Sequence, residues 1–169
     1  IQMLAVHGRT RCQMYNGAAD WHRIADVVAA TRLPVLANGD IRNLADVRAA
    51  MVESGASGVM IGRGAQGRPW LLAQAGDLLA GRAVRPEPDI AQRHLLMKLH
   101  LDDMLSHYGD NAMRLARKHI DWYANGLPGA ARLRDIANNS TDATAVFAAV
   151  DSFFTALAAC KYEGESEAA

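Results

Sequence analysis

The sequence predicts an α/β segment followed by an all-helical segment, and three observations support this order. Short apolar runs alternate with amphipathic helical patterns through residues 1–84. These runs are nearly all apolar, which is typical of strands buried on both faces of a parallel sheet. From residue 89 onward, apolar residues recur at helical spacing instead. We therefore expect two domains, at 1–84 and 89–161, with a linker at 85–88 and a flexible acidic tail at 162–169.

Three strands, each followed by a helix, are predicted in the first segment. We expect the strands at 2–6, 34–37 and 58–61. The helices are expected after the capping residues Asp20 and Asn43, and from Pro69 to Gly81. The polar motifs that end the strands are 31 and 24 residues apart, which fits a (β/α)8 barrel and a flavodoxin-like sheet almost equally well.

Four helices are predicted in the second segment, and they suit a four-helix bundle. The first has an apolar seam with steps of three and four residues, made by Ile90, His94, Met97, Leu101, Met104 and Tyr108. The second follows a break at Gly109-Asp110 and turns inward Met113, Ala116, Ile120 and Tyr123. A short helix at 130–137 and a last one capped by Asp142 follow, the last with Val146, Val150, Phe153 and Leu157 inward.

Composition excludes several classes of protein. The net charge is zero, but residues 1–85 carry ten arginines against six acids (+4), and residues 86–169 carry −4. No apolar run approaches the roughly 20 residues that cross a membrane. Cys12 and Cys160 form no metal or redox motif, and we expect a cytoplasmic protein without a metal. The start at Ile1, without a leader, suggests a piece of a longer protein.

Polar or glycine-rich residues follow all three predicted strands. These motifs are His7-Gly8-Arg9-Thr10, Asn38-Gly39-Asp40 and Gly62-Arg63-Gly64. Because the carboxyl ends of parallel strands share one edge, we expect the motifs to meet at a ligand site, although each alone could simply form a tight turn. The third motif opens a helix at Pro69, an arrangement that binds phosphate. It also satisfies the dinucleotide pattern G-x-G-x-x-G, but it lacks the context of a Rossmann fold.

A basic ridge is predicted on the polar face of the second helix of the bundle. Arg114, Arg117 and Lys118 share this face with Asp121, so the face either contacts a phosphate backbone or is simply solvated. Trp122 and Tyr123 beside it would stack on bases or pack in the core. Among other reactive residues, His94 is expected in the core, His119 between core and surface, and Cys12 as an ordinary thiol.

Four segments of the chain resemble those of a known family. They are His7–Arg11 with Asn16-Gly17, Pro34–Ile41, Met60–Trp70 and Ala116–Tyr123. Together, over about residues 1–157, they resemble the tRNA-dihydrouridine synthases, in particular the bacterial B-type enzymes. The resemblance implies the C-terminal βα units of a (β/α)8 TIM barrel and a helical tRNA-binding domain. It also implies reduction of the C5–C6 bond of a tRNA uridine, with FMN as cofactor and NADPH as reductant.

The resemblance also assigns site residues. It places FMN phosphate and ribityl contacts at Asn38, Gly39, Asp40, Gly62 and Arg63, and it places His7 at the flavin. The proton-donor cysteine of the family follows an Asn-x-Gly-Cys-Pro-like motif that is absent from this sequence, and Cys12 does not replace it. We therefore expect no catalytic residue and no activity in this chain alone, with the N-terminal half of the barrel supplied elsewhere. The alternatives are a dihydroorotate-dehydrogenase-like flavoprotein and a non-enzymatic RNA-binding module.

Overall fold

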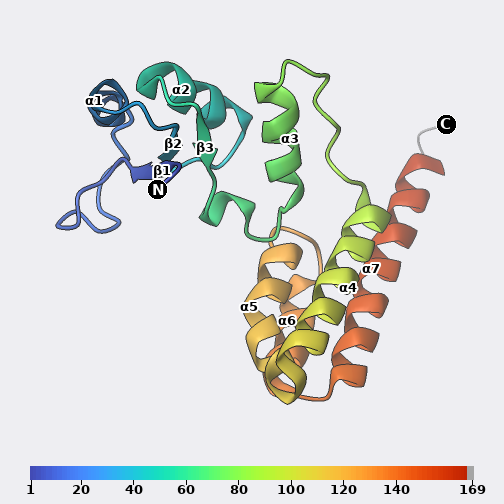
Figure 1. The fold of residues 1–169 in the computed structure, drawn as a ribbon. Coiled ribbons are helices and arrows are strands. Elements are labelled where there is room, and N and C mark those ends of the chain that lie inside the picture. Colours follow the sequence, from blue (N-terminus) through green and yellow to red (C-terminus); the bar gives the residue numbers. More distant parts are fainter. Residues whose placement is uncertain (167–169) are drawn as a thin grey trace. The chain divides into compact units, whose positions relative to one another are not determined.

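The computed structural model describes residues 1–166, and side chains as far as residue 159. The chain divides into two compact units, Ile1–Pro86 and Glu87–Ala169 (Figure 1). The expected tail at 162–169 is described only as far as Ser166, and the side chain of Cys160 lies outside the described part. No helix among the described residues is long and apolar enough to span a membrane.

The first unit contains a parallel sheet in the order β1-β2-β3. Its strands are β1 (Leu4–His7), β2 (Val35–Asn38) and β3 (Gly58–Met60). The first two strands each run one residue further than predicted, so that His7 and Asn38 are their last residues. These two residues are register partners, and Asn38 is in turn the partner of Met60. The polar motifs therefore begin at the same edge of the sheet.

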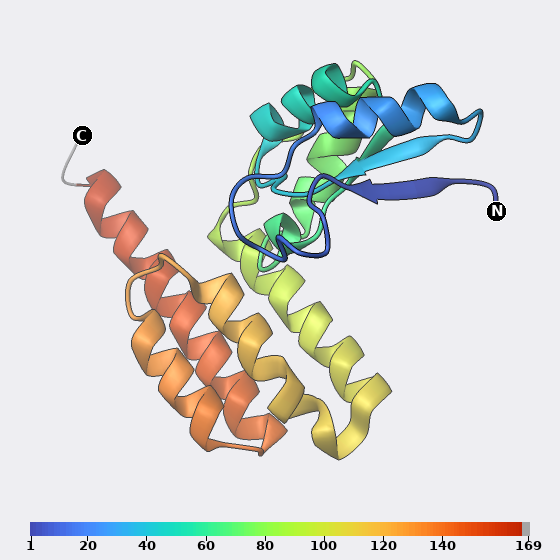
Figure 2. The same cartoon turned by 90° about the vertical axis from the view of Figure 1, so that its left-hand side faces the viewer.

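Helices α1 (His22–Ala30), α2 (Leu44–Ser54) and α3 (Trp70–Leu79) pack together with one face of the sheet (Figure 2). The core between them contains Ile24, Val35, Ala37, Ile41, Val47, Ala50, Ala56 and Ala75. The opposite face is open: Ala5 and His7 are exposed, and Met60 is 49% exposed. Burial on both faces, which such apolar strands have in a complete parallel sheet, is not reached in this chain, because the helices of the unit cover only one face.

The helix ends show which capping predictions were correct. Asn43 caps α2, with its side-chain oxygen accepting a bond of 2.9 Å from the amide of Asp46. Asp20 accepts a longer bond of 3.3 Å from the amide of Arg23, but α1 begins only at His22. Pro69 precedes α3, as expected. The glycine-rich loop before it contains a 3₁₀ turn, η1 (Arg63–Ala65), which the sequence did not predict.

The second unit consists of helical segments with a shared core. They are α4 (Ile90–Tyr108), the 3₁₀ turn η2 (Gly109–Asn111), α5 (Ala112–Ala124), α6 (Ala130–Asn139) and α7 (Ala143–Ser166). Helix α4 contacts α5 and α7, and α6 also contacts both of these helices. Buried side chains of this core include Met97, Leu101, Met104, Met113, Ala116, Ile120, Leu133, Val146, Val150 and Phe154.

Some residues predicted in this core are not buried in it, and Ile90 and Leu157 are only partly buried. Tyr108 is 48% exposed because α4 ends there and the chain turns into η2. Phe154, not Phe153, continues the buried step of four residues from Val150. His94 is only half-buried: its Nε2 lies 2.7 Å from a carboxylate oxygen of Asp151, and its ring stacks on Phe154.

The chain leaves α3 through a segment that is tied back to the first unit. The buried carboxylate of Asp77 accepts hydrogen bonds from the guanidinium groups of Arg82 and Arg85. These bonds hold the pKa of Asp77 far below its ordinary value. Gln74 adds a bond to the carbonyl of Arg85. The segment predicted as a linker at 85–88 therefore begins at a residue that is anchored to α3.

Candidate functional site

A cavity of about 230 Å³ lies at the carboxyl edge of the sheet. All three polar strand ends contribute to it, as expected for parallel strands. Its lining consists of His7, Tyr15, Asn38, Gly39, Asp40, Ile41, Arg42, Met60, Gly62, Arg63 and Gly64. The cavity contains every residue to which the resemblance assigns an FMN contact. Gly62, Arg63 and Gly64, at η1, line the cavity, whereas no residue of the α3 N-terminus does.

An ion pair between Arg9 and Asp40 organises the loops around this cavity. The guanidinium of Arg9 donates to both carboxylate oxygens of Asp40, at 3.0 and 2.5 Å. It also donates to the carbonyls of Asn16 and Gly17, which closes the loop after β1. The side chain of Arg9 is 3% exposed and that of Asp40 is 15% exposed. Both side chains are therefore largely shielded from water. Removing one of them would leave the other charge buried without a partner, which destabilises a protein.

The carboxylate of Asp40 is consequently occupied by the protein itself. The amide of Ala19 donates to it at 2.8 Å, in addition to the two bonds from Arg9. The hydrogen bond from Arg9 is the main cause that keeps the pKa of Asp40 below its ordinary value, against the effect of burial. Asp40 thus remains charged at neutral pH and fixes the loops, although sequence reasoning treated it as a direct ligand contact.

Two further guanidinium groups face the cavity without a hydrogen bond to Asp40. Those of Arg42 and Arg63 lie 3.7 and 3.9 Å from its Oδ1, and the Arg63 side chain is 61% exposed. The guanidinium of Arg63 lies 4.6 Å above the ring of Tyr15. Both cations therefore remain available to an anion, and guanidinium groups suit phosphate oxygens in particular.

Close backbone approach explains two of the glycines. Gly39 has φ +117°, and a Cβ there would contact Ala19 and the ring of His7. A Cβ at Gly64 would overlap the backbone carbonyl oxygen of Ile41. At Gly62, which lines the cavity, a Cβ would meet no other atom of the described residues within 4 Å. The first two glycines therefore bring the loops together, whereas the third leaves room for a ligand.

His7 and Asn38 each use one polar atom for structure and have another without a hydrogen-bond partner among the described residues. The Nδ1 of His7 accepts a bond of 3.1 Å from the amide of Arg9, so the neutral ring carries its proton on Nε2. The side-chain amide of Asn38 donates to the carbonyl of Met60 at 2.6 Å. The Nε2–H of His7 and the Oδ1 of Asn38 are the groups that this arrangement leaves for a ligand.

Sequence reasoning missed three polar residues of this site. Arg9, Tyr15 and Arg42 were not predicted as site residues, because their roles depend on loop closure between distant positions. The only signal was the placement of Arg9 in a motif at the end of a strand. Cys12 is exposed and does not line the cavity. Among the described residues, no group of His, Cys, Asp or Glu is placed to hold a metal ion.

The predicted basic ridge on α5 is split in two. Arg114 and Arg117 line a depression of about 510 Å³ with Tyr108, Asn111 and Leu115. The ammonium of Lys118 lies 5.9 Å from the ring centre of Trp122 and does not line this depression. Asp121, the acid of the ridge, is paired with Arg134 at 3.2 Å.

A cluster of rings lies beside Lys118. The rings of His100 and His119 are 4.7 Å apart, and His119 also meets Trp122 edge-on. Tyr123 is buried, with its hydroxyl 3.4 Å from the Nδ1 of His100. Burial is the main cause that lowers the pKa of His119, with further contributions from His100 and Lys118. His119 is therefore neutral at physiological pH, and Tyr123 belongs to the core.

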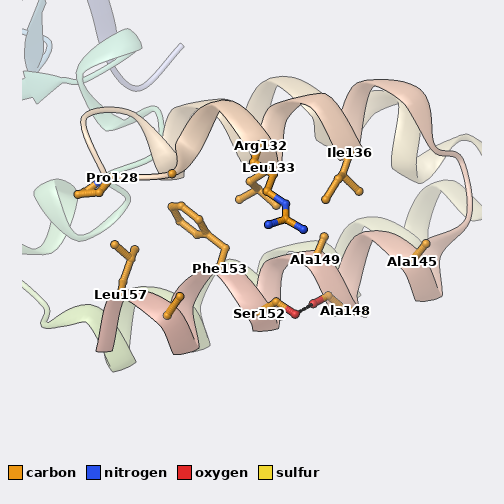
Figure 3. A pocket seen from close by; sticks show the side chains of 12 residues that line it. Pro128, Arg132, Leu133, Ile136, Ala145, Ala148, Ala149, Ser152, Phe153 and Leu157 are labelled. Carbon is orange, nitrogen blue, oxygen red and sulfur yellow. Dashed lines mark hydrogen bonds between the residues drawn. The ribbon is translucent and has the colours of Figure 1, made fainter. Parts of the chain in front are cut away.

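A larger groove, which the sequence did not predict, runs between α6 and α7 (Figure 3). It measures about 610 Å³ and is lined mainly by apolar side chains, including Leu133, Ile136, Phe153 and Leu157. The side chain of Arg132 lies beside these in the close-up view. The hydroxyl of Ser152 is used internally, donating to the carbonyl of Ala148 at 2.8 Å. Phe153, expected in the core, instead lines this groove.

Comparison with known proteins supports one family. The family model described as dihydrouridine synthase matches residues 1–158. A probable tRNA-dihydrouridine synthase of Rickettsia conorii is 42% identical over 158 residues, which are 93% of this chain and 48% of that protein. A protein of the same name from Rhodobacter capsulatus is 47% identical over 156 residues, 92% of this chain and 48% of that protein.

A third relative carries the B-type name. The tRNA-dihydrouridine synthase B of Xanthomonas axonopodis pv. citri is 41% identical over 160 residues, 94% of this chain and 48% of that protein. The chain thus spans about half the length of the curated relatives that it matches. The match extends over both structural units and includes all three polar strand ends and the arginines of α5. The chain belongs to the dihydrouridine synthase family.

Proposed function

We propose that this chain is the part of a tRNA-dihydrouridine synthase that holds the phosphate end of FMN and contacts tRNA. The observation that supports this most is the cavity at the sheet edge, where Arg42 and Arg63 lie beside three converging loops. The family match favours this proposal over the alternative of a dihydroorotate-dehydrogenase-like flavoprotein. An RNA-binding module without enzymatic function would give this arrangement of cations and glycines at the sheet edge no role.

The size of the cavity indicates how much of FMN this chain would hold. Its volume of about 230 Å³ is below the range of roughly 300–1,000 Å³ that is usual for small-molecule sites. It suits a phosphate with part of the ribityl chain, and not a whole flavin. The isoalloxazine ring would then need other parts of the protein, such as further strands of a barrel. We therefore propose that this chain alone does not turn over substrate.

Each residue of the cavity has a defined role in this proposal. The guanidinium of Arg63 and the backbone around Gly62 would bind the phosphate, because a ligand there meets a cation and no Cβ. The Oδ1 of Asn38 is an acceptor for a ribityl hydroxyl, and the Nε2–H of His7 is a donor toward the cofactor. Asp40 would act through Arg9, as a positioning residue that keeps both loops in place.

FMN would supply hydride transfer, with NADPH as the reductant and the C5–C6 bond of a tRNA uridine as the acceptor. The residues of this chain bind and orient; none of them is proposed as the proton donor. Cys12 is exposed and away from the cavity, which agrees with the absence of the cysteine motif of the family. The helical unit would contact the phosphate backbone of tRNA through Arg114, Arg117 and Lys118.

The test of the FMN site is Arg63→Ala in the full-length protein. One charge-assisted hydrogen bond contributes about 1.5–3 kcal/mol, so FMN affinity should fall roughly ten- to hundredfold. Fluorescence titration of the apoprotein with FMN measures this directly. Arg48→Ala removes an exposed arginine of α2 and serves as the matched control, with unchanged affinity expected. Equal FMN affinity of the Arg63→Ala and Arg48→Ala proteins would exclude the phosphate role of Arg63.

A further inference from the structure

The depression between η2 and α5 has the properties of a site for a single oxyanion. Its lining consists of Tyr108, Asn111, Arg114, Leu115 and Arg117, and contains no carboxylate. Asp121, on the same helix, pairs with Arg134, and Asp110 does not line the depression. Two guanidinium groups thus share one concave surface without an acidic partner in its lining.

One atom of this depression lacks a partner that it needs. The Nε of Arg117 is shielded from solvent, and it forms no hydrogen bond within the part of the chain that the structure describes. A buried N–H without an acceptor is unfavourable, and such groups are rare in folded proteins. The protein therefore holds the Arg117 stem in place while its hydrogen-bonding capacity is unused. The Nε itself is out of reach of a ligand, but Arg117 also lines the depression, where an oxyanion would accept hydrogen bonds from the accessible part of the same guanidinium.

The direction of helical side chains explains why two of the three basic residues act together. Side chains of a helix lean toward its N-terminus, so those of Arg114 and Arg117 extend toward Asn111 and Tyr108. They are three positions apart and therefore lie one above the other on the same face. Lys118 instead extends beside the ring of Trp122, at 5.9 Å. The basic face of α5 is thus a two-arginine pocket and a separate lysine.

We infer that this pocket of Tyr108, Asn111, Arg114 and Arg117 binds one phosphate group of the RNA backbone with both arginines at once. The inference rests on the proposed function, because it names the contact by which the helical unit meets tRNA. Two guanidinium groups on one phosphate satisfy several of its oxygens and fix its position. Lys118 then makes an independent contact with another phosphate. The pocket would orient the RNA and would not distinguish its bases.

The two-arginine pocket predicts a specific pattern of salt dependence. Each phosphate contact contributes about 0.7–0.9 to the slope of log K against log salt concentration. If Arg114 and Arg117 hold the same phosphate, Arg114→Ala and Arg117→Ala should each reduce this slope by the contribution of one phosphate contact, about 0.7–0.9, which we call one step. The double variant should then also remove only one step, since residues that share one partner are not additive. Arg114→Ala combined with Lys118→Ala should remove about two steps, roughly 1.4–1.8.

The experiment measures the affinity of the 169-residue chain for an unmodified tRNA transcript by fluorescence anisotropy, over a series of salt concentrations. Circular dichroism verifies that each variant is folded, and Arg117→Lys tests the geometry separately. Lysine keeps the charge but loses the planar fork, so the slope should persist while affinity falls about tenfold or less. Arg48→Ala, on α2, is the control, with unchanged affinity and slope expected.

The outcomes separate this inference from the proposed function. One lost step in the double arginine variant, and two in the variant that combines Arg114→Ala with Lys118→Ala, support the pocket. If tRNA binds but the double arginine variant loses two steps, or none, the pocket is wrong while the tRNA contact stands. If the wild-type chain shows no salt-dependent binding of tRNA, both the pocket and the RNA part of the proposed function are overturned.

Discussion

Replacement of Arg9 by alanine tests whether the buried ion pair holds the candidate site together. The change leaves the Asp40 carboxylate, only 15% exposed, without its main partner. Breaking a buried pair destabilises proteins by about 3–5 kcal/mol. Because Arg42 and Arg63 stand within 4 Å and can move toward Asp40, we expect a smaller loss of about 2–3 kcal/mol. For a unit of 86 residues, total stability is roughly 4–13 kcal/mol.

Urea unfolding followed by tryptophan fluorescence measures this loss. A Trp122→Phe background leaves Trp21 and Trp70, both in the first unit, as reporters. With a slope of about 1–3 kcal/mol per molar urea, the midpoint should fall by about 0.7–3 M. The control is Arg23→Ala, which removes an exposed pair with Asp20 and should change stability by about 0–1 kcal/mol.

The pH dependence and a double-mutant cycle sharpen the test. Because the pKa of Asp40 is lowered in the folded state, its contribution is present above the unfolded value of about 3.9 and is lost as pH falls below it. The destabilising effect of Arg9→Ala should therefore decline progressively as pH falls from that value through the lowered pKa of the folded state. A cycle with Asp40→Asn should show coupling of about 1 kcal/mol or more. Equal midpoints for Arg9→Ala and Arg23→Ala at pH 7 would refute the role of the pair.

Three further predictions follow from local geometry. Gly64→Ala should abolish FMN binding by the full-length protein, because its Cβ would overlap the backbone of Ile41. Gly62→Ala should leave folding intact and weaken only the affinity for FMN, as measured by the same fluorescence titration. Asp77→Asn should accelerate amide hydrogen exchange in residues 82–86 at neutral pH, and in the wild type the same acceleration should come only as acid protonates Asp77. Ala149→Leu should fill part of the groove between α6 and α7 and increase the free energy of unfolding by about 0.5–2 kcal/mol, which calorimetry would measure.

The sequence alone determined the order of the elements and the place of the cavity. Apolar runs that end in His7, Asn38 and Gly62 predict parallel strands whose carboxyl ends share an edge, and the structure places these residues in one cavity. This part was predictable because hydrophobic periodicity and strand direction are local properties of the chain. The family model confirms the resemblance. The sequence alone could show it because its motifs are short and keep their order along the chain.

Only the tertiary structure decided how the charged side chains pair. Arg9 and Asp40 are 31 positions apart, and no local pattern shows that the loop after β1 folds back onto the loop after β2. On α5, the spacing of Arg114, Arg117 and Lys118 gave one ridge, whereas packing against η2 and Trp122 divides it. Likewise, a helical stripe could not choose between Phe153 and Phe154. Periodicity fixes which face of an element is apolar, but the partners of a side chain depend on which elements the fold brings beside it.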